Sequence, residues 1–405
     1  MPKHRILRSF MAVLLALLAL FGALLAWMYN ALPDTFYVTG ESSQLHIASM
    51  PWVTVRQGQE TVSRVDRTDP DRSQNVTLAL FGAIPVKTVR SVQVETRSVQ
   101  VGGTPFGIKM FSDGALVVAF SDQYTSLGTE NPAKEAGLKL GDLIVSAGGR
   151  AIRSNEELTQ AITAAAGRSL SLVYRRDGQE HTTTLTPVED AATGAYRAGV
   201  WVRDSSAGIG TMTFLDPLHG TFAGLGHAIS DTDTGADITF LSGEIVPVMI
   251  TGCVSGTAGS PGELRGEFSA VTAGTVLAND ATGIYGSYTG PQTGQNCVVC
   301  QPQEIALGEA EIWTTVSGST PKRYTVRIER VNMTSGDPNR NLLIKVTDPE
   351  LLAATGGIVQ GMSGSPIVQN GKLVGAVTHV LVNDPTRGYG IFASTMLEKA
   401  DSVAS

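Results

Sequence analysis

A serine between two glycines is the clearest candidate for chemistry in this chain. Residues 361–366 read Gly-Met-Ser-Gly-Ser-Pro, so Ser363 lies on backbone that must turn sharply. Glycine tolerates positive φ and lets a substrate approach the main chain closely. A nucleophilic serine needs such a turn, because its Oγ must be exposed while nearby backbone N–H groups point at a developing oxyanion. A turn without chemistry has the same composition, so the context of the motif decides between the two.

A nucleophilic serine also requires a base within hydrogen-bond reach. His227 lies in Gly-Leu-Gly-His-Ala-Ile-Ser-Asp, where the glycines leave room for the imidazole to face a cleft. His379 lies among apolar strand residues, and His219 lies in the turn-like Asp-Pro-Leu-His-Gly. We therefore prefer His227 as the base, with His379 as the main alternative. The remaining histidines lie in segments with other predicted roles: His4, His46 and His181.

The residue that would orient the base is less clearly indicated. Asp348 precedes Ser363 at the end of a predicted strand, and three aspartates follow His227: Asp231, Asp233 and Asp237. Spacing does not choose among them. Asp348 also has a structural interpretation, because Asp-Pro-Glu-Leu-Leu is a good helix start with Asp at the N-cap and Pro at the first helical position.

The composition narrows the class of protein. A chain of 405 residues accommodates two or three domains, and its 45 glycines favour a turn-rich β protein. The net charge of −7 argues against nucleic-acid binding. The cysteines are Cys253, Cys297 and Cys300, too few for a structural zinc site, and they are compatible with free thiols or with one disulfide. We expect no metal and no cofactor.

The N-terminal segment predicts a membrane anchor. Lys3, Arg5 and Arg8 precede a nearly wholly apolar run from Phe10 to Met28. Nineteen helical residues span about 28 Å, close to the hydrocarbon thickness of a bilayer. The basic flank predicts that residues 1–33 form a cytoplasmic tip and a transmembrane signal anchor, with everything after Asp34 on the extracytoplasmic side. A cleaved signal peptide is the alternative.

Residues 34–101 predict a β-rich module or linker, and residues 102–190 carry a more specific sequence pattern. The run Pro-Ala-x-x-Ala-Gly-Leu-x-x-Gly-Asp-x-Ile at 132–144 resembles the PDZ domains of bacterial envelope proteases. The resemblance implies a groove that takes an extended peptide by strand addition. It places the loop that holds a terminal carboxylate at Thr104, Phe106, Gly107 and Ile108, although Pro105 lacks an N–H. A PDZ domain that only positions its neighbour is the alternative.

Residues 195–405 hold Ser363, and here the resemblance is close. It rests on Gly-Ile-Gly-Thr-Met-Thr-Phe, Gly-Leu-Gly-His-Ala-Ile-Ser-Asp, Gly-Ile-Val-Gln-Gly-Met-Ser-Gly-Ser-Pro and Asp-Pro-Thr-Arg-Gly-Tyr-Gly-Ile-Phe. These motifs resemble the stage IV sporulation protein B peptidases of endospore-forming bacteria. The resemblance implies a chymotrypsin-like double β-barrel and a serine endopeptidase, with Ser363 as nucleophile, His227 as base and Asp348 as the third important residue. It further implies self-cleavage, then cleavage of a membrane-bound regulator of an intramembrane protease that matures a sigma factor, in the space between the forespore membranes.

Two further expectations follow from a trypsin-like arrangement. The backbone N–H groups of Gly361 and Ser363 would form the oxyanion hole, and the strand with Thr378 and His379 would pair with the substrate. The fold expected is mainly β: a transmembrane helix, a PDZ domain and a C-terminal double β-barrel. Two other functions compete, an envelope protease of the HtrA type, in which the PDZ domain follows the protease, and a non-catalytic PDZ scaffold.

Overall fold

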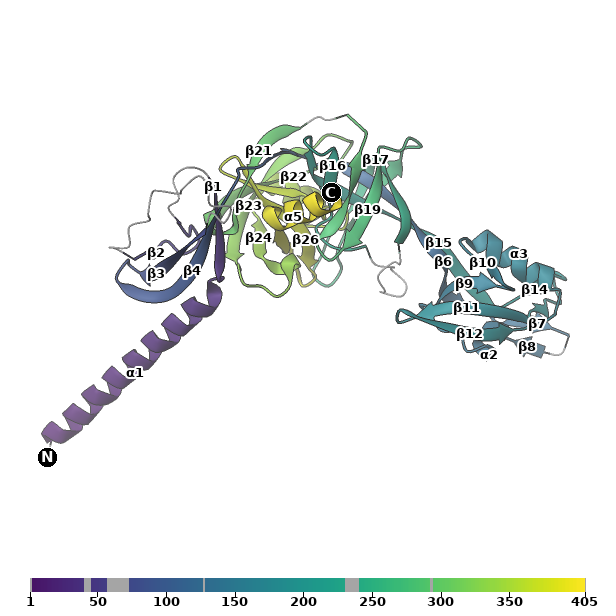
Figure 1. The fold of residues 1–405 in the computed structure, drawn as a ribbon, viewed down its shortest axis with the longest axis horizontal. Coiled ribbons are helices and arrows are strands. Elements are labelled where there is room, and N and C mark those ends of the chain that lie inside the picture. Colours follow the sequence, from purple (N-terminus) through teal and green to yellow (C-terminus); the bar gives the residue numbers. More distant parts are fainter. Residues whose placement is uncertain are drawn as a thin grey trace.

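The structure is a computed structural model that describes residues 2–39, 45–56, 73–126, 128–229, 240–291 and 294–404. A long N-terminal helix leads into a small sheet, two β-barrels lie side by side in the centre, and a third body projects at the far end (Figure 1). The fold is mainly β, as expected. The two barrels and their order along the chain determine where the candidate catalytic residues meet.

Six of the described strands close the first barrel. Neighbouring strands pair antiparallel in the order β6, β15, β16, β20, β19, β17 and back to β6. Its interior is an apolar cluster that includes Phe106, Ile108, Phe222 and Ile284. The strands are β6 (Pro105–Phe120), β15 (Val200–Asp216), β16 (Thr221–Gly224), β17 (Phe240–Val254), β19 (Gly274–Asp280) and β20 (Gly283–Tyr288). β18 (Glu263–Phe268) extends this barrel by pairing with β17.

Six further strands close the second barrel in the order β22, β23, β24, β27, β26, β25 and back to β22. The largest buried cluster of the described chain fills it, with Ile312, Val326, Ile344 and Ile367 among its members. The strands are β22 (Gly308–Thr314), β23 (Lys322–Val331), β24 (Leu342–Val346), β25 (Pro366–Gln369), β26 (Lys372–Leu381) and β27 (Asp384–Phe392). The Asn370-Gly371 turn joins β25 to β26, and both residues have positive φ, as is typical of Asn-Gly hairpins.

Short elements join the two barrels. β5 (Ser98–Val101) pairs with β15 of the first barrel and with β21 (Gln295–Val299), which in turn runs parallel to β26 of the second. The C-terminal helix α5 (Ala393–Ala404) buries Met396 and Leu397 in a cluster with residues of both barrels, and it crosses the face seen in Figure 1. The fold is therefore a double β-barrel of the chymotrypsin type, which confirms the expected architecture.

The PDZ domain is inserted within the first barrel. β6 and β15 continue beyond the barrel, and their outer halves pair there, with Trp201 opposite Ala119. The domain adds two helices, each with a side-chain N-cap: Asn131 accepts from the Lys134 N–H, and Ser154 accepts from the Glu157 N–H. Its elements are α2 (Pro132–Glu135), α3 (Asn155–Ala165), β9 (Leu143–Ala147), β10 (Arg150–Ala151), β11 (Leu170–Arg176) and β12 (Gln179–Leu185), with two small ribbons, β7 (Gln123–Thr125) with β8 (Gly128–Glu130) and β13 (Val188–Glu189) with β14 (Tyr196–Arg197).

This arrangement corrects the expected domain boundaries. A PDZ domain at 102–190 followed by a peptidase domain at 195–405 is wrong at the first junction, because the inner half of β6 belongs to the first barrel. β6 forms antiparallel ladders with β15 and β17 on its two sides, and the barrel closes only through these ladders. Local sequence patterns do not reveal such pairings, because the partner strands lie about 100 residues away or more.

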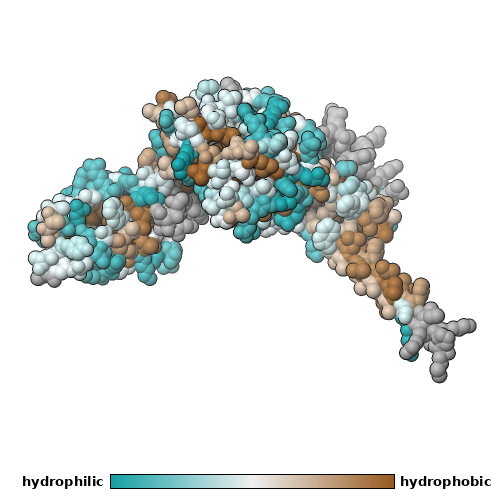
Figure 2. Space-filling view, turned by 180° about the vertical axis from the view of Figure 1, so that it is seen from behind, coloured by the Kyte–Doolittle hydropathy of each residue, from teal (hydrophilic) through white to brown (hydrophobic). Residues whose placement is uncertain are grey.

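The N-terminal part consists of one helix and one sheet. α1 (Pro2–Ala31) contains a span, Leu7–Ala31, that is long and apolar enough to cross a membrane, and Figure 2 shows its hydrophobic surface clear of the globular body. A four-stranded sheet follows, in the order β1 (Thr35–Thr39), β4 (Ile84–Val94), β3 (Ser73–Leu80) and β2 (Val53–Val55). The sheet contacts the second barrel: the Ala48 N–H donates to the Gln303 carbonyl at 2.7 Å, and the Gln303 amide donates to the Tyr37 carbonyl.

Candidate active site

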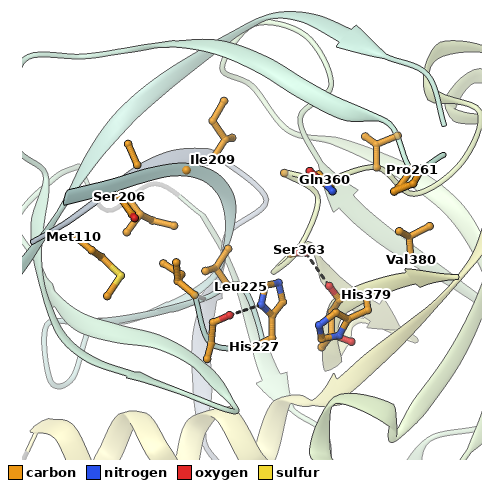
Figure 3. Close-up of a pocket in the computed structure, with 18 of the residues that line it drawn as sticks. Met110, Ser206, Ile209, Leu225, His227, Pro261, Gln360, Ser363, His379 and Val380 are labelled. Atoms are coloured by element: carbon orange, nitrogen blue, oxygen red, sulfur yellow. Dashed lines mark hydrogen bonds between the residues drawn. The ribbon is translucent and has the colours of Figure 1, made fainter. Parts of the chain in front are cut away.

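The predicted nucleophile and base lie in one cleft between the two barrels. His227 follows β16 of the first barrel, and Ser363 precedes β25 of the second. Both residues line a cavity of about 690 Å³, and Figure 3 shows them on the same side of it together with His379. Residues 136 positions apart in the sequence are thus brought together, as the serine-peptidase hypothesis requires.

Two threonines of β15 hold the loop that contains Ser363. The Thr211 N–H donates to the Ser363 carbonyl at 2.9 Å, and the Thr211 hydroxyl donates to the Gly361 carbonyl at 2.8 Å. The Thr213 hydroxyl donates to the Gly364 carbonyl at 2.8 Å. Both threonines are buried, so these bonds form away from competing water. The nucleophile of the second barrel is therefore fixed by a strand of the first.

The contact between the Ser363 loop and Thr211 of β15 requires a glycine at position 364. Its φ is +93°, and a Cβ there would lie 2.0 Å from the Thr211 carbonyl oxygen and 2.5 Å from the Leu225 nitrogen. Any side chain would push the Ser363 loop away from β15. The glycine after the serine thus has a steric reason, which strengthens the catalytic interpretation of the motif over an ordinary turn.

The backbone near Ser363 is arranged as the predicted oxyanion hole requires. Gly361 has φ of +97°. The N–H groups of Met362, Gly364 and Ser365 donate to backbone carbonyls. In the described part of the chain, the N–H groups of Gly361 and Ser363 donate to no protein acceptor, and both residues line the cleft. These two donors are available to a substrate oxygen, as the sequence analysis expects.

The Ser363 hydroxyl donates to the Thr378 carbonyl at 2.8 Å (Figure 3). His227 is bonded through Nδ1 to the carbonyl oxygen of Ala228 at 2.7 Å. A carbonyl oxygen can only accept, so Nδ1 carries the proton and Nε2 keeps a free lone pair. In this state of the cleft the serine hydroxyl is directed to β26, and among the described residues no hydrogen bond joins it to His227.

The two histidines of the cleft interact. The rings of His227 and His379 are 4.7 Å apart between centroids. Burial lowers the pKa of His227 below its usual value, although the Ala228 carbonyl opposes that effect. Desolvation within the cleft, followed by the neighbouring His227, lowers the pKa of His379 to about 4, even though the residue as a whole is exposed. Both imidazoles are therefore neutral near pH 7, as a base must be.

Asp348 lies at the start of a helix, where its carboxylate is already engaged. It is the N-cap of α4 (Pro349–Thr355) and accepts from the backbone N–H groups of Glu350, Leu351 and Thr325. Among the described residues, no hydrogen bond or ion pair joins it to His227. The structure thus supports the helix-cap interpretation and not the predicted orienting role. The alternative aspartates, Asp231, Asp233 and Asp237, lie outside the described residues.

The residues predicted to bind peptide divide into two groups. Thr378 and His379 lie on β26 and line the cleft beside Ser363, where a substrate strand would be expected. By contrast, the prediction that Thr104, Phe106, Gly107 and Ile108 form a PDZ carboxylate loop is wrong. Phe106 and Ile108 are core residues of the first barrel, Gly107 pairs with Ile209 and Val246, and the Thr104 carbonyl accepts from the Met212 N–H.

The cysteines and one polar cluster contain side-chain atoms of the kinds that bind metal ions. All three cysteines, Cys253, Cys297 and Cys300, are free thiols. Asp216, His219 and Asp401 come close enough to hold a metal ion. Arg97 already bridges this cluster, with its guanidinium 2.6 Å from Asp216 and 2.9 Å from Asp401. The guanidinium neutralises the carboxylates that a cation would need, so we interpret this cluster as an ion-pair network.

Comparison with protein families supports a serine peptidase with a PDZ domain. The family described as SpoIVB peptidase S55 matches residues 194–397, and the PDZ domain family matches residues 108–186. The PDZ match begins inside β6, at the point where this strand still belongs to the first barrel.

Individual relatives are similar over parts of the chain. Serine protease HTRA1 of Xenopus tropicalis is 42% identical over 60 residues, which is 15% of this chain and 13% of that protein. The matched segments span only 13% to 24% of the length of the curated relatives.

Solved structures are similar at low identity. The Rv3671c protease of M. tuberculosis in its active form shares 15% identity over 48% of this chain and 74% of that chain, with a TM-score of 0.31. The PDZ domain of the SdrC-like protein Lmo2051 from Listeria monocytogenes shares 21% identity over 22% of this chain and 87% of that chain, with a TM-score of 0.18.

Proposed function

The chain belongs to the SpoIVB peptidase S55 family and is a serine endopeptidase with a PDZ domain, and from this we propose that Ser363 is its nucleophile and His227 its general base. The observation that carries the proposal is the shared cleft: the serine and the histidine come from different barrels and face the same cavity. Among the described residues, Nε2 of the imidazole and the two backbone donors of the cleft have no hydrogen-bond partner.

The chemistry follows from these positions. Nε2 of His227 removes the proton of the Ser363 hydroxyl as Oγ attacks the substrate carbonyl carbon. The N–H groups of Gly361 and Ser363 stabilise the negative charge on the carbonyl oxygen. The protonated imidazole then donates its proton to the leaving amine, which leaves an acyl-enzyme. Water, activated by the same nitrogen, hydrolyses this ester and restores the enzyme.

We propose that the substrates are its own N-terminal region and a membrane-bound regulator of an intramembrane protease, in the signalling that activates a sigma factor during sporulation. The family similarity supports this proposal, and so does the attachment of the barrels to α1. The Thr334 hydroxyl of the second barrel donates to the Asn30 carbonyl at the end of the helix, at 3.1 Å. A catalytic domain held at the membrane, on its extracytoplasmic side, favours substrates that are also held there.

The proposal is tested with the full-length protein in detergent. Ser363→Ala is expected to abolish self-cleavage and labelling by a fluorophosphonate probe, while the thermal melt stays unchanged. Ser365→Ala is the matched control, because Ser365 is two residues away and its hydroxyl donates to the Thr314 hydroxyl, at 2.9 Å. N-terminal sequencing of the released product gives the cleavage position. Continued self-cleavage by the purified Ser363→Ala protein would refute the assignment.

The same experiment separates the competing functions. A non-catalytic scaffold would show neither self-cleavage nor labelling in the wild type. An HtrA-type quality-control protease would degrade unfolded proteins such as casein, and the proposed regulator protease would leave them intact. The position of the PDZ domain, between β6 and β15 of the first barrel, differs from the order expected of the HtrA type, in which the PDZ domain follows the protease.

A further inference from the structure

The base of a serine peptidase must be held in one tautomer and one orientation, and a carboxylate usually does this. In this structure the partner of His227 Nδ1 is a peptide group, the carbonyl of Ala228. A peptide carbonyl orients the ring and selects the tautomer as a carboxylate would, because it too accepts the Nδ1 proton. The orientation of the ring then depends on what holds the Ala228–Ile229 peptide group in place.

Asn279 binds the next residue at both of its backbone groups. The Ile229 N–H donates to Asn279 Oδ1 at 2.8 Å, and Asn279 Nδ2 donates to the Ile229 carbonyl at 3.1 Å. The Ile229 N–H and the Ala228 carbonyl belong to the same planar peptide unit, and in a trans peptide they point in opposite directions. Holding the N–H with Asn279 therefore aims the carbonyl at the imidazole.

Asn279 itself stands on a rigid element. It is the penultimate residue of β19 and pairs with Ile284 of β20 in the first barrel. The turn after it is closed by Asp280, which accepts from the Thr282 N–H at 2.8 Å and forms an ion pair with Lys399 of α5 at 2.8 Å. The hairpin also packs against the chain before the base: a Cβ at Gly283 would lie 2.6 Å from the Gly224 oxygen.

We propose that Asn279 is the positioning residue for the catalytic base, and that it acts through the Ala228–Ile229 peptide group. The relay runs from Asn279 Oδ1 to the Ile229 N–H, and from the Ala228 carbonyl to Nδ1–H of His227. Hydrogen bonds in such a chain polarise one another, so the amide also strengthens the carbonyl as an acceptor. The inference rests on the proposed role of His227, and its primary readout does not require turnover.

The primary test is the tautomer of His227 in the full-length Ser363→Ala protein, labelled with [15N]histidine in detergent. A difference spectrum against a variant that also carries His227→Gln identifies the signals. With Asn279 present, the His227 ring is expected to be protonated at Nδ1, the less common tautomer for a free imidazole. In Asn279→Ala the Nδ1–H signature should be lost or mixed with the Nε2–H form. An unchanged tautomer in Asn279→Ala would overturn the proposal.

The kinetic test uses proteins that retain Ser363. Asn279→Ala is expected to lower kcat about 10- to 100-fold with KM within twofold, because the ring loses its orientation while the cleft keeps its shape. Asn279→Asp keeps the acceptor for the Ile229 N–H and should recover part of kcat. Asn341→Ala is the matched control: its Nδ2 also donates to a backbone carbonyl at 3.1 Å, that of Asn332, away from the cleft. It should keep full kcat.

Other outcomes are equally decisive. If Asp231→Asn, Asp233→Asn or Asp237→Asn lowers kcat by 1,000-fold or more and changes the tautomer, a carboxylate orients the base and the proposal fails. If Asn279→Ala does not fold, Asn279→Asp takes its place in the tautomer measurement, where the Nδ1–H form is expected to persist and its loss would contradict the relay. A wild type without peptidase activity but with the Nδ1–H tautomer would refute the proposed function and leave the relay intact.

Discussion

Thr211→Val is the substitution that most directly tests how the first barrel controls the nucleophile. Valine has the shape of threonine but lacks the hydroxyl that donates to the Gly361 carbonyl at 2.8 Å. The peptide unit that contains this carbonyl is held at its other end by the bond from the Met362 N–H to the Val359 carbonyl. Removing one of the two bonds loosens the residue whose N–H is a proposed oxyanion donor.

The magnitude follows from the burial of the bond. Thr211 is 1% exposed, so the Gly361 carbonyl loses its partner without gaining water. A buried polar group left unsatisfied costs about 1–3 kcal/mol. If this cost falls wholly on the transition state, kcat decreases about 5- to 150-fold. Most of that range lies below the roughly 100- to 1,000-fold loss that follows complete removal of one oxyanion donor.

The assay is kcat for a peptide substrate, normalised to active sites by a fluorophosphonate titration, together with a thermal melt. Thr315→Val is the matched control, because Thr315 is 2% exposed and its hydroxyl donates to the Gly103 carbonyl at 3.0 Å. Thr211→Ser should restore most of kcat. If Thr211→Val melts earlier but keeps its kcat, the bond stabilises the fold only, and the reasoning that β15 positions the oxyanion donors is refuted.

Three further predictions concern pH, Asp348 and substrate choice. Since burial lowers the pKa of His227, kcat/KM should be retained below pH 6.5 and lost only as the pH falls through that lowered pKa; an acid limb at or above 6.5 would contradict this. Burial opposes ionisation of Asp348, but its backbone donors lower its pKa, so its stabilisation is present above pH 4 and is lost as the pH falls further. Asp348→Ala should therefore cost about 1 kcal/mol of unfolding free energy at pH 7 and leave kcat within threefold; a 1,000-fold loss of kcat without a change in melting would reinstate Asp348 as the orienting acid. The cleft wall near Ser363 is aliphatic, with Ile358, Val359 and Val380, so a peptide library should show cleavage after aliphatic residues, and a preference for charged residues there would disprove it.

The sequence is informative wherever the signal is local. The glycines around Ser363 and His227, the apolar run of α1 and the caps Asn131 and Ser154 all depend on neighbours within a few residues, and the structure agrees with each. Asp348 follows the same rule: its local pattern describes a helix N-cap, which the structure has, whereas the family resemblance implies a catalytic role.

The features that could not be predicted depend on long-range pairing. Ile108 lies in a segment that matches a PDZ pattern, and only its pairing with Gly208 and Ile245 places it in the first barrel. Asn279 lies in an ordinary turn sequence, and its contact with Ile229 spans 50 residues. Thr211 and Thr213 gave a weak signal in Gly-Thr-Met-Thr-Phe, because strand alternation places both on one face. Which loop that face contacts could not be read from the sequence.

The insertion of the PDZ domain between β6 and β15 has a consequence for folding. The two strands pair in the first barrel between residues about 100 positions apart, such as Pro105 and Thr211, and closing so long a loop is slow and entropically costly. A folded PDZ domain has already paired Phe120 with Val200, so the inner halves of the strands need only continue the same ladder. A PDZ domain that folds first would thereby template the catalytic barrel. Excision of residues 102–190 would remove both the template and a barrel strand, and the loss of activity in such a deletion would report misfolding before it reported anything about ligand binding.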